Sequence, residues 1–174
     1  MKAYTNVNLV TCDSAFHVYR EGLLVVEDDR IAYCGPYDEN WLEKCSETVD
    51  YEGAWIMPGL VNCHTHSAMT LLRGIRDDSN LHEWLEDYIW PAESQFTEDL
   101  TTQAVQLALA EMLLSGTTTF NDMYNPQGVE IDRIYHTVRQ SGMRCYFSPT
   151  LFSSEAETAK ETRSEEHTSE LQSR

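Results

Sequence analysis

The chain has 174 residues, enough for one domain with a sizeable core, and a formal net charge of −17 from 12 basic and 29 acidic side chains. This acidic balance, without a cluster of lysines and arginines, argues against nucleic acid or an anionic membrane as a partner. No window approaches the roughly 18 apolar residues that span a bilayer, and the cysteines are scattered without a CxxC pair. We therefore expect a cytoplasmic protein with reduced thiols.

The first 56 residues are expected to form short strands separated by turns. Runs of β-branched and aromatic residues alternate with turn signals such as Asp28-Asp29 and Gly35-Pro36. The expected elements are strands at 4–11, 22–27, 30–34 and 48–51 and a helical turn at 39–44. These strands carry too little apolar surface to close a core alone, so we expect them to need strands from elsewhere in the protein.

From Ala54 onward the pattern changes to strands that alternate with helices. Gly116 follows a helical pattern at the position where a glycine commonly ends a helix. The expected elements are a strand at 55–63 broken by Pro58-Gly59, helices at 81–90 and 99–115, a strand at 117–122, a helix at 131–141 and a strand at 143–151. This β-α-β-α-β order predicts an α/β fold in which helices cover a parallel sheet.

The last residues differ in origin from the rest. The segment Arg163–Ser173 matches the translation of a widely used short-read sequencing adapter. We therefore interpret 163–174 as an artefactual tail, excluded from the fold. The native protein is then expected to continue beyond about Thr162, and genomic DNA there to encode more strands and a further histidine at the end of one of them.

The triplet His64-Thr65-His66 is the most informative chemical motif. Residues i and i+2 of a strand face the same side, about 6.6 Å apart, so two imidazoles can bind one cation at about 2.0–2.1 Å. The pair follows an apolar strand, and sites in parallel α/β proteins are built at such carboxyl ends. Two histidines at this spacing can equally be incidental, so the triplet alone leaves metal binding open. Asp122, at the end of the next strand, is expected to hydrogen-bond a loop rather than to reach the site.

Several motifs around this pair resemble the amidohydrolases. Met57–His66 is similar to their first barrel strand, written PGxxxxHxH. The likeness extends to the thioadenosine/adenosylhomocysteine deaminases and triazine hydrolases at residues 67–74, 90–93, 115–119 and 122–124, and it covers essentially all of residues 1–152. This resemblance implies a partial (β/α)8 TIM barrel, of which the chain holds the first three strands, preceded by part of a composite β-sandwich. The implied domains are 1–56 for the sandwich part and 57–162 for the barrel part.

The resemblance also implies that His64 and His66 bind one divalent metal ion, most often zinc, and that Glu93 binds the ribose hydroxyls of a nucleoside. Read alone, Glu93 could equally be a solvated residue near a helix start. In the family the metal activates a water, which attacks the amine-bearing carbon of the purine. The general acid–base Glu and Asp come from later strands, so no catalytic acid or base is expected among these residues and the chain alone is expected to be inactive.

The substrate implied for the full-length protein is 5′-methylthioadenosine, S-adenosylhomocysteine or a related adenosine derivative, and a homo-oligomer is left open. Some members carry an arginine at the end of the third strand, where it meets the homocysteine carboxylate, but this chain has Ser148-Pro149 there. The alternatives are guanine or cytosine deamination, triazine hydrolysis, a metal-free scaffold of the same fold, and a truncated chain without a function of its own.

Overall fold

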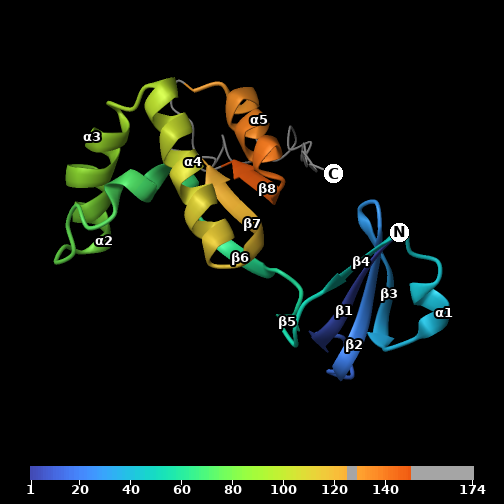
Figure 1. The fold of residues 1–174 in the computed structure, drawn as a ribbon. Coiled ribbons are helices and arrows are strands. Elements are labelled where there is room, and N and C mark those ends of the chain that lie inside the picture. The colour runs from blue at the N-terminus through green and yellow to red at the C-terminus, as the bar shows by residue number, and fades with distance from the viewer. Residues whose placement is uncertain (125–128, 150–174) are drawn as a thin grey trace, which may run out of the picture. The chain divides into compact units, whose positions relative to one another are not determined.

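The computed structural model describes residues 1–124 and 129–149, and Figure 1 shows their elements. The chain divides into two compact units, Met1–Pro58 and Gly59–Arg174. The tail predicted at 163–174 lies outside the described residues, as does the end of the strand predicted at 143–151. Within the described ranges no helix is long and apolar enough to cross a membrane.

The first unit is a five-stranded sheet with one short helix. Its elements are β1 (Lys2–Val10), β2 (Val18–Glu27), β3 (Arg30–Pro36), α1 (Glu39–Leu42), β4 (Glu47–Asp50) and β5 (Trp55–Ile56). The strand order is β3-β2-β1-β4, and β5 also pairs with β1. The pairs β1–β2 and β2–β3 are antiparallel, whereas β4 and β5 run parallel to β1. All four strands predicted here are present.

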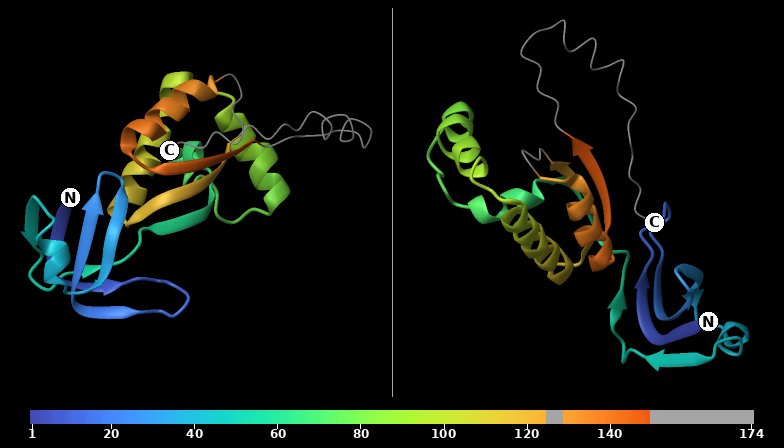
Figure 2. Two further views of the ribbon diagram at one scale, coloured as in Figure 1. Left: turned by 90° about the vertical axis from the view of Figure 1, so that its right-hand side faces the viewer. Right: turned by 90° about the horizontal axis from the view of Figure 1, so that it is seen from above.

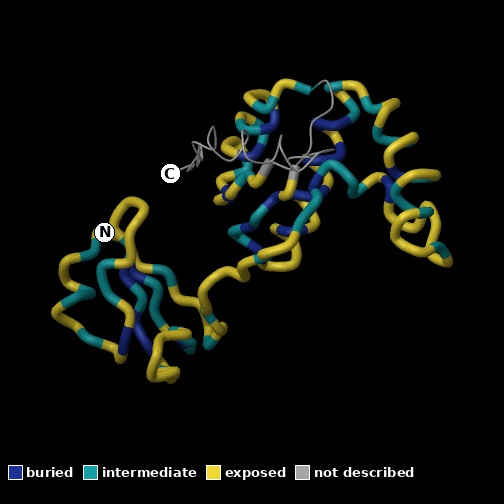
Figure 3. Tube along the Cα trace, turned by 180° about the vertical axis from the view of Figure 1, so that it is seen from behind, coloured by how far each residue is buried: buried dark blue, intermediate teal, exposed yellow. Residues whose placement is uncertain are grey.

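The core of the first unit is small. Ala3, Leu23 and Val25 are fully buried, and Trp41 and Leu42 of α1 pack against them. Leu23 and Val25 are two positions apart in β2 and face the same side, because successive residues of a strand point to opposite faces of the sheet. The buried positions of this unit follow the same strands in Figure 3.

The second unit contains the predicted parallel sheet. Its strands are β6 (Leu60–Thr65), β7 (Thr117–Tyr124) and β8 (Arg144–Pro149), in that spatial order and all parallel. Its helical elements are the 3-10 helix η1 (Ser67–Leu72), α2 (Leu81–Glu83), the π-helix η2 (Trp84–Ile89), α3 (Trp90–Glu93), α4 (Glu98–Leu114) and α5 (Ile131–Ser141). The predicted β-α-β-α-β order is confirmed.

The prediction of a single helix at 81–90 is wrong. The helical segment continues to Glu93 and contains a π turn, in which the Trp90 N–H donates to the Leu85 carbonyl. The cause is Pro91, whose ring would meet the carbonyl of Asp87 in an α-helix and which lacks an N–H of its own. A wider turn before the proline relieves this conflict. The 3-10 helix at 67–72 was not predicted either.

Helices α4 and α5 lie side by side on one face of the sheet, as Figures 1 and 2 show. The core between them is formed by buried residues from both helices and from two strands: Val105, Ala108, Leu109 and Met112 of α4, Phe120 of β7, Ile134 and Val138 of α5, and Cys145 of β8, together with Met143. Burial of one such large side chain is worth about 1.5–3 kcal/mol. This core fixes the sheet whose strand ends carry the histidine pair.

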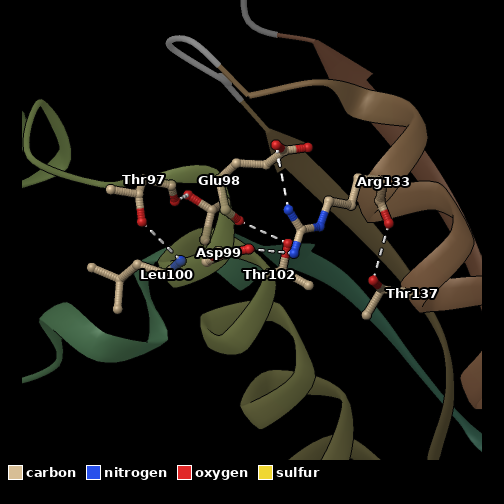
Figure 4. A network of polar contacts seen from close by, with 8 residues as sticks. Thr97, Glu98, Asp99, Leu100, Thr102, Arg133 and Thr137 are labelled. Atoms are coloured by element: carbon tan, nitrogen blue, oxygen red, sulfur yellow. Dashed lines mark hydrogen bonds and ion pairs between the residues drawn. The ribbon is translucent and has the colours of Figure 1, made fainter.

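Polar contacts join the first turn of α4 to α5 (Figure 4). Thr97 caps α4, since its hydroxyl accepts from the Leu100 N–H at 3.2 Å. Arg133 of α5 reaches both acidic residues of that turn, with 3.3 Å to the Glu98 carboxylate and a closer contact to Asp99. These groups are exposed to water, so the pairs orient the helices and add little stability.

The structure explains why position 59, in the motif before the histidine pair, is a glycine. A Cβ placed there would lie 2.1 Å from Thr118 Oγ1 and 2.8 Å from Thr118 Cβ, so β6 and β7 could not approach as they do. We expect Gly59→Ala to lower the free energy of unfolding by about 1–3 kcal/mol, as overpacking does. Thr118→Ala removes the nearer atoms and should restore part of the loss in the double variant, measured by urea unfolding of the full-length protein. Additive effects would contradict the steric explanation.

Candidate metal centre

The histidine pair lies at an irregularity in the pairing of β6 with β7. Asn62 pairs with Phe120 but Thr65 pairs with Asp122, so β6 has one more residue than β7 over this stretch. Such a bulge redirects the side chains near it and often lies beside functional sites. The His64 N–H donates to the Asn62 side-chain oxygen at 3.1 Å, which fixes the backbone there.

The structure brings the two imidazoles together. The ring centroids of His64 and His66 are 5.1 Å apart, and the ring planes meet at 76°. His66 Nδ1 lies 3.1 Å from the carbonyl oxygen of Met123 at the end of β7. A carbonyl can only accept, so Nδ1 carries a proton, and in the neutral imidazole Nε2 then keeps its lone pair for a ligand bond. This is the arrangement in which metal-bound histidines are commonly held.

A buried carboxylate lies beside this pair. Asp122 has no exposed surface, and it accepts from the Ser67 N–H at 2.9 Å and from the Ser67 hydroxyl. Burial raises the pKa of Asp122, and the Ser67 hydrogen bonds and the nearby His66 partly offset this rise. The predicted hydrogen bonding of Asp122 is present, but its partner Ser67 begins the 3-10 helix η1 rather than a loop.

Glu93 is half-buried at the end of α3. Burial raises the pKa of its carboxyl, and the charge of His66 opposes that rise. The Glu93 carboxylate is therefore within electrostatic reach of His66, although the two residues are far apart in sequence.

A hollow of ≈ 400 Å³ opens beside His66. Its wall is partly apolar, with Met69 and Trp84, and its rim carries Arg73 and Asp77. Clefts of this size hold small organic ligands. Trp84 is half-buried at this hollow.

The described residues fit part of a metal site. Two imidazoles lie close together, and the His66 tautomer leaves Nε2 for a ligand bond. A catalytic zinc usually has three protein ligands, and within residues 1–124 and 129–149 no group of three or more His, Cys, Asp or Glu side chains could hold an ion. The described part of the chain therefore offers two candidate ligands rather than a complete site.

The chain belongs to the amidohydrolase family, whose model matches residues 55–172. It is 48% identical over 151 residues to a 5-methylthioadenosine/S-adenosylhomocysteine deaminase of Bacillus cytotoxicus, with 87% of this chain and 35% of the relative covered. A protein of the same name from Bacillus cereus strain AH820 is 47% identical over 152 residues, which are 86% of this chain and 34% of the relative. The chain thus spans about a third of the length of these curated relatives.

Solved structures show the same fold. A triazine hydrolase of Arthrobacter aurescens matches with a TM-score of 0.74 and 22% identity over 87% of this chain and 36% of that one. A guanine deaminase of C. acetobutylicum matches with a TM-score of 0.73 and 22% identity, over 84% of this chain and 35% of that one. An adenosine deaminase of Xanthomonas campestris with bound zinc matches with a TM-score of 0.70 and 29% identity, over 94% of this chain and 38% of that one. The mixed α/β fold is therefore of the TIM-barrel type found in amidohydrolases.

Proposed function

We propose that the full-length protein is a metal-dependent hydrolase that deaminates 5′-methylthioadenosine, S-adenosylhomocysteine or a related adenosine derivative. The observation that carries the proposal is the end of β6, where two imidazoles converge and His66 Nδ1 is engaged by a backbone carbonyl. The names of the relatives at 48% and 47% identity support the choice of substrate.

In this proposal His64 and His66 hold one divalent metal ion, zinc, which is the ion bound in the adenosine deaminase of similar fold. The bound metal would lower the pKa of a water towards 7 and so supply a hydroxide. The Glu93 carboxylate accepts from the two ribose hydroxyls, because an ionised carboxylate only accepts. We assign no proton-transfer residue among the described residues.

Beyond the family fold, we propose a division of the chain into parts of two domains and a tail. Residues 1–56 would form the N-terminal part of a β-sandwich, 57–162 the first part of a (β/α)8 barrel, and 163–174 no native domain. β6, β7 and β8 would be the first three barrel strands, which agrees with their parallel order. We also propose a cytoplasmic location, a nucleoside as the partner molecule, and a homo-oligomer as a testable assembly state.

The test is kcat/KM for ammonia release by the full-length, zinc-loaded protein. Adenosine, methylthioadenosine and adenosylhomocysteine are compared with guanine and cytosine, and triazine hydrolysis is assayed alongside by product formation. Turnover of at least one adenosine derivative well above the other compounds is expected. Turnover only of guanine, cytosine or a triazine would replace the proposed substrate with another amidohydrolase chemistry.

Substrate preference follows from the end of β8. Ser148 pairs with Met123, whose carbonyl contacts His66, and Pro149 is the next residue. Pro149 offers neither a charge nor an N–H to the homocysteine carboxylate. We therefore expect methylthioadenosine or adenosine to be deaminated at least as well as adenosylhomocysteine.

Pro149→Arg should raise the relative kcat/KM for adenosylhomocysteine by about ten- to a hundredfold, the value of a hydrogen bond to a charged group. Pro149→Gln is the matched control, because it adds length without charge. A strong preference of the unaltered enzyme for adenosylhomocysteine, not increased by Pro149→Arg, would refute this expectation.

A further inference from the structure

Two consecutive residues near the end of β7 hold the two consecutive residues that follow β6. The Asp122 carboxylate accepts from the Ser67 N–H at 2.9 Å and from the Ser67 hydroxyl. The Met123 carbonyl oxygen lies 3.1 Å from His66 Nδ1. Ser67 and Asp122 are 1% and 0% exposed, so water does not compete for the two hydrogen bonds between them.

The backbone at His66 needs such support. Its φ of −128° and ψ of 77° belong to neither a helix nor a regular strand. His66 therefore lies between the last ladder contact of β6, at Thr65, and the first residue of η1, at Ser67. The His66 carbonyl accepts from the Met69 N–H at 2.9 Å, the first hydrogen bond of η1, and this bond does not involve the ring.

A carboxylate this deeply buried is unfavourable unless strong donors compensate it. Both donors here come from one residue, Ser67, through its backbone and its side chain. They hold the peptide that joins His66 to Ser67 at its N–H, while the Met69 N–H holds its carbonyl. An apolar residue at position 122 could fill the space but could not impose that orientation.

We propose that Asp122 is a positioning residue, which acts through Ser67 to aim the His66 ring so that Nδ1 meets the Met123 carbonyl and Nε2 would be available to bind a metal. This inference rests on the proposed role of His66 as a ligand. It assigns to Asp122 neither a bond to the metal nor a proton transfer.

The experiment compares three variants of the full-length protein. Asp122→Ala removes both acceptors. Ser67→Ala removes the hydroxyl but keeps the backbone N–H bond. Asp122→Asn keeps one acceptor for that N–H, and its amide can donate to the Ser67 hydroxyl. Phe120→Leu is the control, because it disturbs the core from the same strand and removes neither hydrogen bond to Ser67.

Two readouts separate positioning from general stability. The first is the ¹⁵N spectrum of the His66 ring in the metal-free protein, assigned by comparison with His66→Gln. The second is the zinc dissociation constant, measured by competition with a chelator. Partners that orient a metal ligand typically change metal affinity by about 10- to 100-fold.

Asp122→Ala should weaken zinc binding by about that factor and change the His66 ring signals from a single Nδ1-protonated form to a mixture. Ser67→Ala should have a smaller effect, Asp122→Asn should restore most of the affinity, and Phe120→Leu should lower stability while zinc affinity stays the same.

The proposal is overturned if Asp122→Ala leaves the His66 spectrum unchanged, or if it weakens zinc binding no more than Phe120→Leu does at an equal loss of stability. If the unaltered protein binds no zinc, the proposed function fails. A His66 spectrum that still responds to Asp122→Ala would then support the positioning role by itself.

Discussion

Replacing His66 with alanine is expected to remove the bound metal and to lower kcat/KM for nucleoside deamination by about a thousandfold or more. The magnitude follows because a metal contributes several kcal/mol to the transition state, and each 1.36 kcal/mol is tenfold in rate. His66 is half-buried beside the hollow, with Nδ1 engaged by the Met123 carbonyl.

The measurement is metal content and ammonia release by the full-length variant. His82→Ala is the matched control, because that imidazole is exposed on α2 and outside the hollow. His64→Ala should behave as His66→Ala does. Full metal content together with full activity in either of these two variants would exclude the pair as the metal centre.

Replacing Glu93 with glutamine or alanine is expected to lower kcat/KM for ribonucleosides by about ten- to a hundredfold. The loss arises because ribose hydroxyls would no longer donate to a charged acceptor. The unaltered enzyme should discriminate against the 2′-deoxy form of the same substrate, and Glu93→Ala should abolish most of this discrimination. Measuring kcat/KM for both substrates with both proteins gives a thermodynamic cycle that isolates the contribution of the contact between Glu93 and the 2′-hydroxyl.

The control for Glu93 is Glu86→Gln, an exposed carboxylate on the preceding π-helix. If Glu93 only supports the end of its helix, Glu93→Gln will change the unfolding free energy and leave the preference for ribose over deoxyribose as it was. That result would remove Glu93 from the substrate site.

Much of the fold was predictable because its signals are local. The change from strand-turn spacing to strand-helix alternation predicted the parallel sheet, and Pro58-Gly59 predicted the break between β5 and β6. The π turn was not predicted, because it depends on how a helix accommodates Pro91 rather than on any periodic pattern. Sequence reasoning expected an ordinary helix there.

The candidate site was predictable only in part. The spacing of His64 and His66 identified the pair, but metal binding by these two residues and the ribose contact of Glu93 stay predictions. Asn62 and Ser67 were missed. Their roles depend on the register shift between β6 and β7 and on the burial of Asp122, which arise when distant segments pair.

The dependence of deamination on a metal at His64 and His66 is measured most directly by removal and return of zinc. The full-length protein is stripped with a chelator, and ammonia release from methylthioadenosine is followed as zinc is added back. Activity should fall to background and recover in proportion to zinc bound, with no recovery in His66→Ala. A metal-free protein that deaminates methylthioadenosine at the original rate, or a His66→Ala variant that recovers with zinc, would contradict the proposed metal centre.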